Sequence, residues 1–192
     1  RDESSLSQQI GLFAVHNMPS KNLPSTPSLQ WTKEEAFRYC QNLATTHYEN
    51  FTVGSILLSA KTRRHVYAIY SYCRWVDDLG DETYSPTSSD EIWHWLINTL
   101  RKEPKDETEK RLLLLERWED ELIQCYGGNP THPVLIALQD TIRTFDIPKI
   151  PFLKLIEANR MDQTSHSYDT FQDLLNYCDH SANPVGHLIL YL

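Results

Sequence analysis

The chain has 192 residues, a net charge of −8 and four cysteines without C-x-x-C spacing. This length is enough for one well-cored domain, and the negative charge argues against a nucleic-acid backbone as the partner. An anionic ligand stays compatible with the charge, because Mg²⁺ reverses the local sign. The cysteine spacing favours reduced thiols and a cytoplasmic setting.

The elements expected along the chain are helices. Residues 1–28 are rich in Ser, Pro, Asn and Gln, so we expect a flexible leader before one domain over residues 29–192. Thr32 and Glu35 fit a capping box that opens a helix running towards Thr46. The sequence then favours helices over about 61–81, 90–100, 107–126, 132–145, 152–163 and 170–177. Strand-like alternation is hard to find, so we predict an all-α fold.

The last residues form an apolar helical run that stops at Leu192 without a polar tail. We therefore expect the chain to be a fragment. Pro184 inside this run predicts a kink. The small residues Ser181, Ala182 and Gly186 allow either a ligand or another helix to approach the backbone. No apolar run in the sequence approaches the roughly 20 residues that a membrane span needs.

The central helix carries the most informative pattern. At about 100° per residue, Tyr70, Arg74, Asp77 and Asp81 fall within one sector of roughly 60°. The opposite side is apolar. Buried charge needs a partner or a metal, and two carboxylates one turn apart are suitable oxygen ligands for Mg²⁺. Arg74 suits phosphate contacts, and aromatic faces such as that of Tyr70 stabilise a cation.

Two plainer interpretations stay open for this helix. A run of the form D-D-x-x-D-E also occurs at solvated helix ends, and the tyrosines also fit ordinary core packing. The spacing Glu91-x-x-His94 occurs in di-iron bundles, but those need two copies, so we expect these two residues on the surface. His47 in a loop could face a ligand or be structural, and His132 is expected to mark a helix start.

Several segments together resemble the squalene/phytoene synthase family. Residues 47–58 and 68–82 look like its opening helix-loop and its first aspartate-rich motif. Residues 128–134 and 158–162 look like its middle segment, and 177–186 resembles the cavity-lining helix before the second aspartate-rich motif. The forms H-Y-E-N-F and S-A-N-P-V-G look most like the bacterial hopanoid-pathway subgroup, the squalene and hydroxysqualene synthases.

The resemblance implies an isoprenoid-synthase-type helical bundle with a central cavity. It implies Mg²⁺ held by Asp77 and Asp81 with Asp78 and Glu82 in support, and catalytic roles for Arg74, Tyr70 and Asn183. The substrate-binding residues that it implies are His47, Asn50, Phe51, Tyr70, Arg74, Tyr177, Ala182 and Asn183.

The implied partner is a prenyl diphosphate, either presqualene or farnesyl diphosphate, with peripheral membrane contact through the lipid product. Because the second aspartate-rich motif falls beyond Leu192, we expect the chain to be inactive alone. A phytoene- or dehydrosqualene-type synthase is the alternative within the family. A non-enzymatic helical binding module and an iron-binding bundle are the alternatives outside it.

Overall fold

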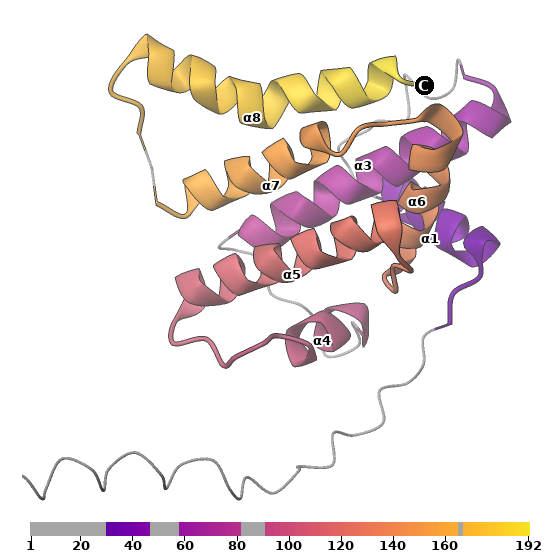
Figure 1. The fold of residues 1–192 in the computed structure, drawn as a ribbon, viewed down its shortest axis with the longest axis horizontal. Helices are drawn as coiled ribbons and strands as arrows, with labels where there is room; N and C mark the ends of the chain where they lie inside the picture. The colour runs from indigo at the N-terminus through magenta and orange to yellow at the C-terminus, as the bar shows by residue number, and fades with distance from the viewer. Residues whose placement is uncertain (1–29, 47–57, 82–90, 165–166) are drawn as a thin grey trace, which may run out of the picture.

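The computed structural model describes residues 30–46, 58–81, 91–164 and 167–192. These residues form helices and no strand, which confirms the all-α prediction. The described helices, shown in Figure 1, are α1 (Lys33–Thr46), α3 (Ala60–Gly80), α4 (Glu91–Asn98), α5 (Glu107–Gly127), α6 (Pro133–Phe145), α7 (Ile150–Asp162) and α8 (Phe171–Leu190). The leader over 1–28 lies outside the described residues, as do His47, Asn50, Phe51 and Glu82.

Local capping chemistry sets several of the helix starts. The Thr32 hydroxyl accepts from the Glu35 amide at 3.3 Å, while the Glu35 carboxylate accepts from the Thr32 amide at 2.8 Å, as the capping box predicts. Thr170 opens α8 through a second capping box. His132 caps α6, its Nδ1 accepting from the amide of Val134 at 3.3 Å. The expected role of His132 at a helix start is therefore confirmed.

Helix α3 is the central element of the fold. It packs against α1, α5, α6, α7 and α8. Trp75 lies stacked between Trp93 and Trp118, with ring centroids 5.0 and 5.5 Å away. Tyr72 is fully buried, and its hydroxyl donates to the carbonyl of Phe152 at 3.0 Å. These contacts place the apolar side of α3 in the core, as its sequence pattern predicts.

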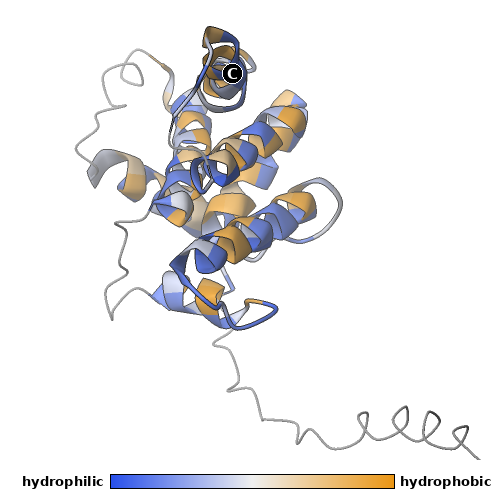
Figure 2. Ribbon diagram, turned by 90° about the vertical axis from the view of Figure 1, so that its left-hand side faces the viewer, coloured by the Kyte–Doolittle hydropathy of each residue, from blue (hydrophilic) through white to orange (hydrophobic). Residues whose placement is uncertain are grey.

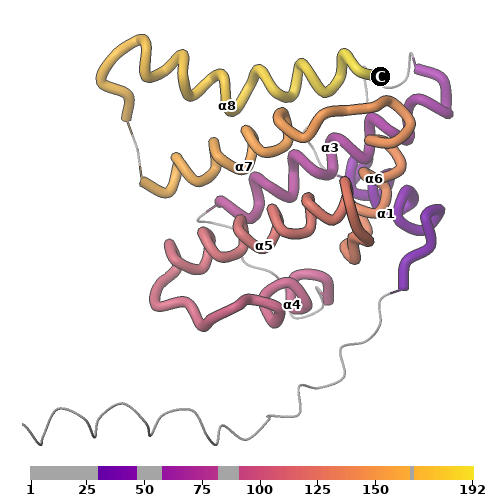
Figure 3. The backbone as a smooth tube through the Cα atoms, in the orientation of Figure 1, coloured from indigo at the N-terminus to yellow at the C-terminus, as the bar shows by residue number. Residues whose placement is uncertain are grey.

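Helix α8 lies at the edge of the bundle, alongside α7, as the tube in Figure 3 shows. The sequence predicts that the final helix ends near Tyr177 and that Pro184 kinks a separate run. The first expectation needs correction, because α8 is one helix from Phe171 to Leu190 with Pro184 inside it, while the kink stays a prediction. Pro184 and Leu188 are its buried residues, so the helix continues through the proline on a face packed against the bundle. None of the described helices is long and apolar enough to cross a membrane.

Candidate functional site

Polar side chains from three helices gather at one end of the bundle. The C-terminal ends of α3 and α7 and the first half of α8 lie towards the left of Figure 1. Asp77 and Asp81 come from the end of α3, Asn159 and Asp162 from the end of α7, and Tyr177 from α8. We call this group of five residues the acidic end of the bundle.

Asp77 is held by a residue from α7. Its Oδ1 accepts from Asn159 Nδ2 at 3.3 Å, and the same nitrogen donates to the carbonyl of Leu155 at 3.2 Å. Gly80 makes this approach possible, because a Cβ at this position would lie 2.3 Å from Asn159 Oδ1. The glycine that ends α3 therefore lets the Asn159 amide reach the Asp77 carboxylate.

Asp78 is engaged within its own helix. Arg74 lies one turn earlier, and its guanidinium is 2.6 Å from Asp78 Oδ1. The two side chains retain 25% and 10% of their exposure, so the pair is largely removed from water. A buried carboxylate needs such a partner. This pairing engages the carboxylate of Asp78 with Arg74.

Tyr177 donates its hydroxyl to Asp162 Oδ2 at 3.0 Å. Burial, and next the hydrogen bond with Asp162, raises the pKa of Tyr177 to about 12. The negative charge of Asp77 acts in the same direction, which places this tyrosine within electrostatic reach of α3. The ring of Tyr168 lies 5.0 Å from that of Tyr177. The Tyr177 hydroxyl thus keeps its proton and donates a hydrogen bond, and its ring offers an aromatic face.

Asp162, Tyr168 and Asn159 were given no role by sequence reasoning. Asn159 and Asp162 stand inside the segment 158–162 that resembles the family, and their spacing of three puts them on one face of a helix. That spacing was the available signal. It does not reveal which residues the face meets, since Asp77 is 82 positions away from Asn159.

The charges at the end of α3 favour a bound cation. The last turn of α3 contains no basic residue, although the C-terminal end of a helix attracts positive charge. Asp77 and Asp81 are like charges one turn apart, which destabilises the helix further. Oxygen ligands of this kind suit Mg²⁺, which commonly uses one or two carboxylates together with water and substrate phosphate. In the described ranges no three His, Cys, Asp or Glu residues are grouped to hold a metal.

The remaining predicted residues of α8 are exposed. Ala182 and Asn183 face solvent, and Asn183 Nδ2 donates to Asp179 Oδ1 at 3.4 Å along the same helix. Asp179 also accepts from Lys154 of α7 at 2.5 Å. At Gly186 a Cβ would meet no heavy atom within 4 Å, so no described segment approaches the helix there. Tyr70 is half-buried on α3.

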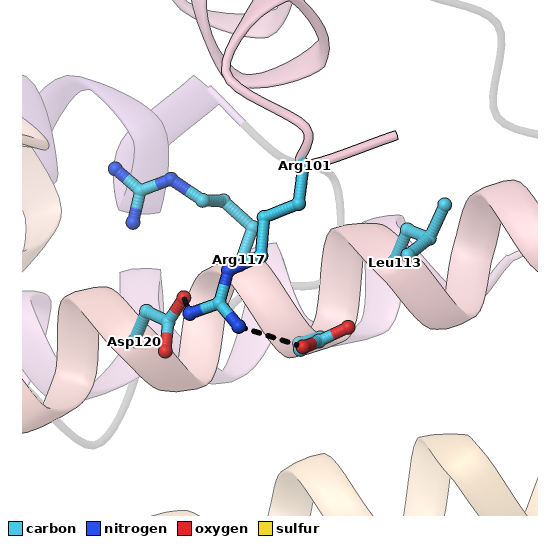
Figure 4. A pocket seen from close by; sticks show the side chains of 5 residues that line it. Arg101, Leu113, Arg117 and Asp120 are labelled. Atoms are coloured by element: carbon cyan, nitrogen blue, oxygen red, sulfur yellow. Dashed lines mark hydrogen bonds and ion pairs between the residues drawn. The ribbon is translucent and has the colours of Figure 1, made fainter. Parts of the chain in front are cut away.

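Neither the surface pocket beside α5 nor the pair Glu91 and His94 forms a comparable polar site. A shallow surface pocket beside α5 is occupied by ion pairs, because Arg101 contacts Glu116 at 3.2 Å and Asp120 at 2.7 Å (Figure 4). Glu91 and His94 are both exposed on α4, as expected for surface placement of this spacing.

Comparison with known proteins identifies relatives of one family. The model of the squalene/phytoene synthase family matches residues 44–192. A phytoene synthase of Arthrospira platensis is 28% identical over 159 residues, covering 83% of this chain and 44% of that protein. A chloroplastic phytoene synthase of Daucus carota is 32% identical over 152 residues, covering 79% of this chain and 33% of that protein.

Two solved structures have a similar fold. Squalene synthase HpnC from Alicyclobacillus acidocaldarius superposes with a TM-score of 0.66 at 40% identity, over 83% of this chain and 51% of that chain. A dehydrosqualene synthase superposes with a TM-score of 0.64 at 24% identity, over 82% and 47%, which supports the fold alone. The chain thus spans about half the length of these two structures and less than half of the curated relatives named above. Because the family model matches most of its length, the chain belongs to the squalene/phytoene synthase family.

Proposed function

We propose that this chain contributes the first metal- and diphosphate-binding half of a Mg²⁺-dependent squalene-forming enzyme. The reaction is ionisation of a prenyl diphosphate, presqualene or farnesyl diphosphate, that leads to hydroxysqualene or squalene. The observation that carries the proposal is the acidic end of the bundle, where Asp77 and Asp81 leave the C-terminal end of α3 without a basic residue. A cation at that place relieves both the repulsion and the helix dipole.

Each residue has a distinct task in this proposal. Asp77 and Asp81 hold Mg²⁺, which when bound neutralises the leaving diphosphate. Arg74 contacts the diphosphate, and Asp78 fixes Arg74 by the 2.6 Å ion pair. Tyr70 and Tyr177 present aromatic faces to the carbocation, since a ring face attracts positive charge.

Other assignments rest on the family resemblance. Asn50 contacts the diphosphate, while His47 and Phe51 line the substrate site. Glu82 supports the metal. All four lie outside the described residues. Ala182 and Asn183, which face solvent among the described residues, are assigned to the cavity that the resemblance implies, with Asn183 near the quenching water. Peripheral contact with a membrane follows from the apolar product.

The squalene-type product is supported by the identity of 40% to a solved squalene synthase. In the hydroxysqualene-forming reaction, presqualene diphosphate loses its diphosphate, the resulting cation rearranges, and water adds to give hydroxysqualene. The second candidate is condensation of two prenyl diphosphates of the phytoene or dehydrosqualene type. It is supported by the curated phytoene synthases, which are 28 to 32% identical to this chain. A non-enzymatic helical binding module is the alternative from another class.

The test uses the protein as expressed from its own gene. Presqualene and farnesyl diphosphates are offered separately with Mg²⁺, and the products are identified by mass spectrometry. We expect Asp77→Asn and Asp81→Asn each to lower turnover about 10³-fold, because metal stabilisation of the transition state is worth several kcal/mol. Asp169→Asn, an exposed acid just before α8, is the matched control and should retain turnover.

Unchanged Mg²⁺-dependent turnover in both α3 variants would remove the enzymatic role of this helix and favour the binding module. Formation of dehydrosqualene from farnesyl diphosphate, with neither squalene nor hydroxysqualene among the products, would favour the condensing alternative within the family.

A further inference from the structure

Gln163, the residue that follows α7, joins the ends of three helices. Its side-chain Nε2 donates to the carbonyl of Gly80 at 2.9 Å and to the carbonyl of Asn159 at 3.0 Å. Its Oε1 accepts from Nε of Arg111, in the first turns of α5, at 2.5 Å. Both amide protons and the amide oxygen therefore have partners, so the side chain has one defined orientation.

These hydrogen bonds act on the end of α3 in two ways. The bond to Gly80 fixes the backbone between Asp77 and Asp81, where the last helical bond runs from the Asp81 amide to the Asp77 carbonyl at 2.9 Å. The bond to the carbonyl of Asn159 fixes the α7 turn whose side chain donates to Asp77 Oδ1 at 3.3 Å. One side chain thus restrains both the backbone of the last turn and the carboxylate of Asp77.

The last turn of α3 needs such a restraint. The final carbonyls of a helix have no partner within the helix, and its ends fray. Here the two acids also repel each other without a basic residue nearby in the turn. A metal ligand set binds weakly when its carboxylates are free to move, which is why partners outside the ligands matter for affinity.

We propose that Gln163 is a positioning residue that holds the Asp77 end of α3 in its cation-binding geometry, with Arg111 fixing the orientation of Gln163. This inference rests on the proposed function, because it assumes that Asp77 and Asp81 bind the cation. It assigns a task to a residue outside the acidic end of the bundle that touches neither the metal nor the substrate.

The chain offers a matched control in Gln139. This glutamine also lies half-buried between helices, and its Nε2 donates to the carbonyls of Gln124, Cys125 and Gly128 at the C-terminal end of α5. Gln139 therefore donates hydrogen bonds to backbone carbonyls in the same way as Gln163, but at a helix end that carries no proposed metal ligand. A purely structural role for Gln163 predicts the same phenotype for the two glutamines.

The experiment compares Gln163→Met with Gln139→Met in the protein expressed from its own gene. Methionine keeps the length of the side chain and removes the amide without adding charge. Binding of inorganic diphosphate is followed by the rise in Tm at increasing MgCl₂, which gives the Mg²⁺ concentration for half of the effect. Hydrogen exchange of the Asp81 amide is measured in the metal-free protein. Gln163→Glu, which keeps a partner for Arg111, is made as a second variant in case the methionine variant does not fold.

For Gln163→Met we expect the half-effect Mg²⁺ concentration to rise about tenfold, the size typical for partners of metal ligands. Exchange at Asp81 should also become faster, while Gln139→Met changes neither quantity, although both variants lower Tm. The inference is overturned if the two methionine variants have the same Mg²⁺ requirement and the same exchange at Asp81. Asp77→Asn distinguishes failure of the proposed function from failure of the inference about Gln163. If Asp77→Asn leaves the Mg²⁺ response intact, the proposed function fails. If Asp77→Asn abolishes the response but Gln163→Met does not change it, only the inference about Gln163 is overturned.

Discussion

Helices α3 and α8 have similar length and similar amphipathic sequences, but they occupy opposite environments. Of the 21 residues of α3, 12 are buried, whereas of the 20 residues of α8 only Pro184 and Leu188 are buried. On α8 the side chains of Phe171 and Leu190 keep 73% and 84% of their exposure. Hydrophilic and hydrophobic residues alternate along the helices in Figure 2, so hydropathy along one helix does not distinguish the two cases. What distinguishes them is the number of neighbours, since α3 packs against five helices and α8 mainly against α7.

Polar groups on the two helices should therefore differ in how much they contribute to the free energy of unfolding. A polar group on the buried side of α3, such as Asp78, is enclosed by the bundle and needs a partner. On α8 the same kind of group stays in contact with water. Matched substitutions on the two helices can therefore test the difference directly.

The largest difference is expected between two leucines. Leu79 of α3 is 1% exposed, and Leu79→Ala should lower the free energy of unfolding by about 2–5 kcal/mol through lost burial and a cavity. Leu190→Ala, at the exposed end of α8, should change it by less than about 0.5 kcal/mol. Urea denaturation measures both. A cost at Leu190 similar to that at Leu79 would show that this face of α8 is covered in solution.

The next difference concerns ion pairs. Arg74→Met leaves the buried carboxylate of Asp78 without its guanidinium, and we expect a loss of about 3 kcal/mol in the free energy of unfolding. Lys154→Met breaks the pair of Lys154 with Asp179, in which the side chains are 32% and 48% exposed, and should cost less than about 1 kcal/mol. The double variant Arg74→Met with Asp78→Leu should recover much of the first loss. Equal costs for the two single variants would contradict the contrast between the helices.

Acid stability provides a third test through His132, whose ring packs against Trp75 of α3 with centroids 4.5 Å apart. Burial, and next the charge of Arg117, lowers the pKa of His132 to about 3. Between about pH 6.5 and pH 3 the His132 ring therefore stays neutral in the folded protein, whereas in the unfolded chain it binds a proton once the pH falls below the ordinary pKa of histidine. The contribution of neutral His132 to the free energy of unfolding is fully present above about pH 6.5 and is lost as the pH falls towards 3. At pH 5 the loss is roughly 2 kcal/mol.

His132→Asn keeps an N-cap oxygen and removes the titrating ring, so its stability should fall less steeply between pH 7 and pH 5. Its lower overall stability does not affect this slope. His187→Asn, the same substitution at an exposed position of α8, is the matched control. The free energy of unfolding is measured by urea denaturation at each pH. Parallel profiles for the parent protein and His132→Asn would refute the contribution of His132 to acid sensitivity.

The smallest effect is expected for two helical glycines. Gly186→Ala on α8 meets no heavy atom within 4 Å and should stabilise the protein by about 0.5–1 kcal/mol, because alanine favours helix. Gly80→Ala on α3 places a methyl group against Asn159 and displaces the side chain that donates to Asp77. The lost hydrogen bond, worth about 0.5–1.5 kcal/mol, offsets that gain. A thermal shift upward by the same amount in both variants would show that Asn159 yields without cost.

Sequence reasoning performed well wherever the cause is local. The start of α1 at a capping box, the bounds of α3 within one residue of expectation, and His132 at the start of α6 are all confirmed. It was wrong about the end of α8, which was expected near Tyr177 and lies at Leu190. A proline removes one hydrogen bond, but the packing of Pro184 and Leu188 on the bundle keeps the helix continuous.

The candidate site was predictable in part. The stripe of Arg74, Asp77 and Asp81 follows from helix geometry alone. Asn159, Asp162 and Gln163 could not be assigned, because their partners lie on other helices. The metal and substrate roles of the predicted residues stay predictions until the variants are measured.

For this protein, the sequence by itself determined that the chain is all-α, where most of the helices begin and end, and which residues of α3 share its polar stripe. These properties depend on contacts within a few turns of chain, which capping residues and apolar spacing record directly. Only the tertiary structure decided that α3 is enclosed and α8 is exposed, and that Asn159 and Gln163 meet the end of α3 across 82 and 83 positions of sequence. An amphipathic face requires a partner without specifying which one, so the neighbours of each helix were settled by packing.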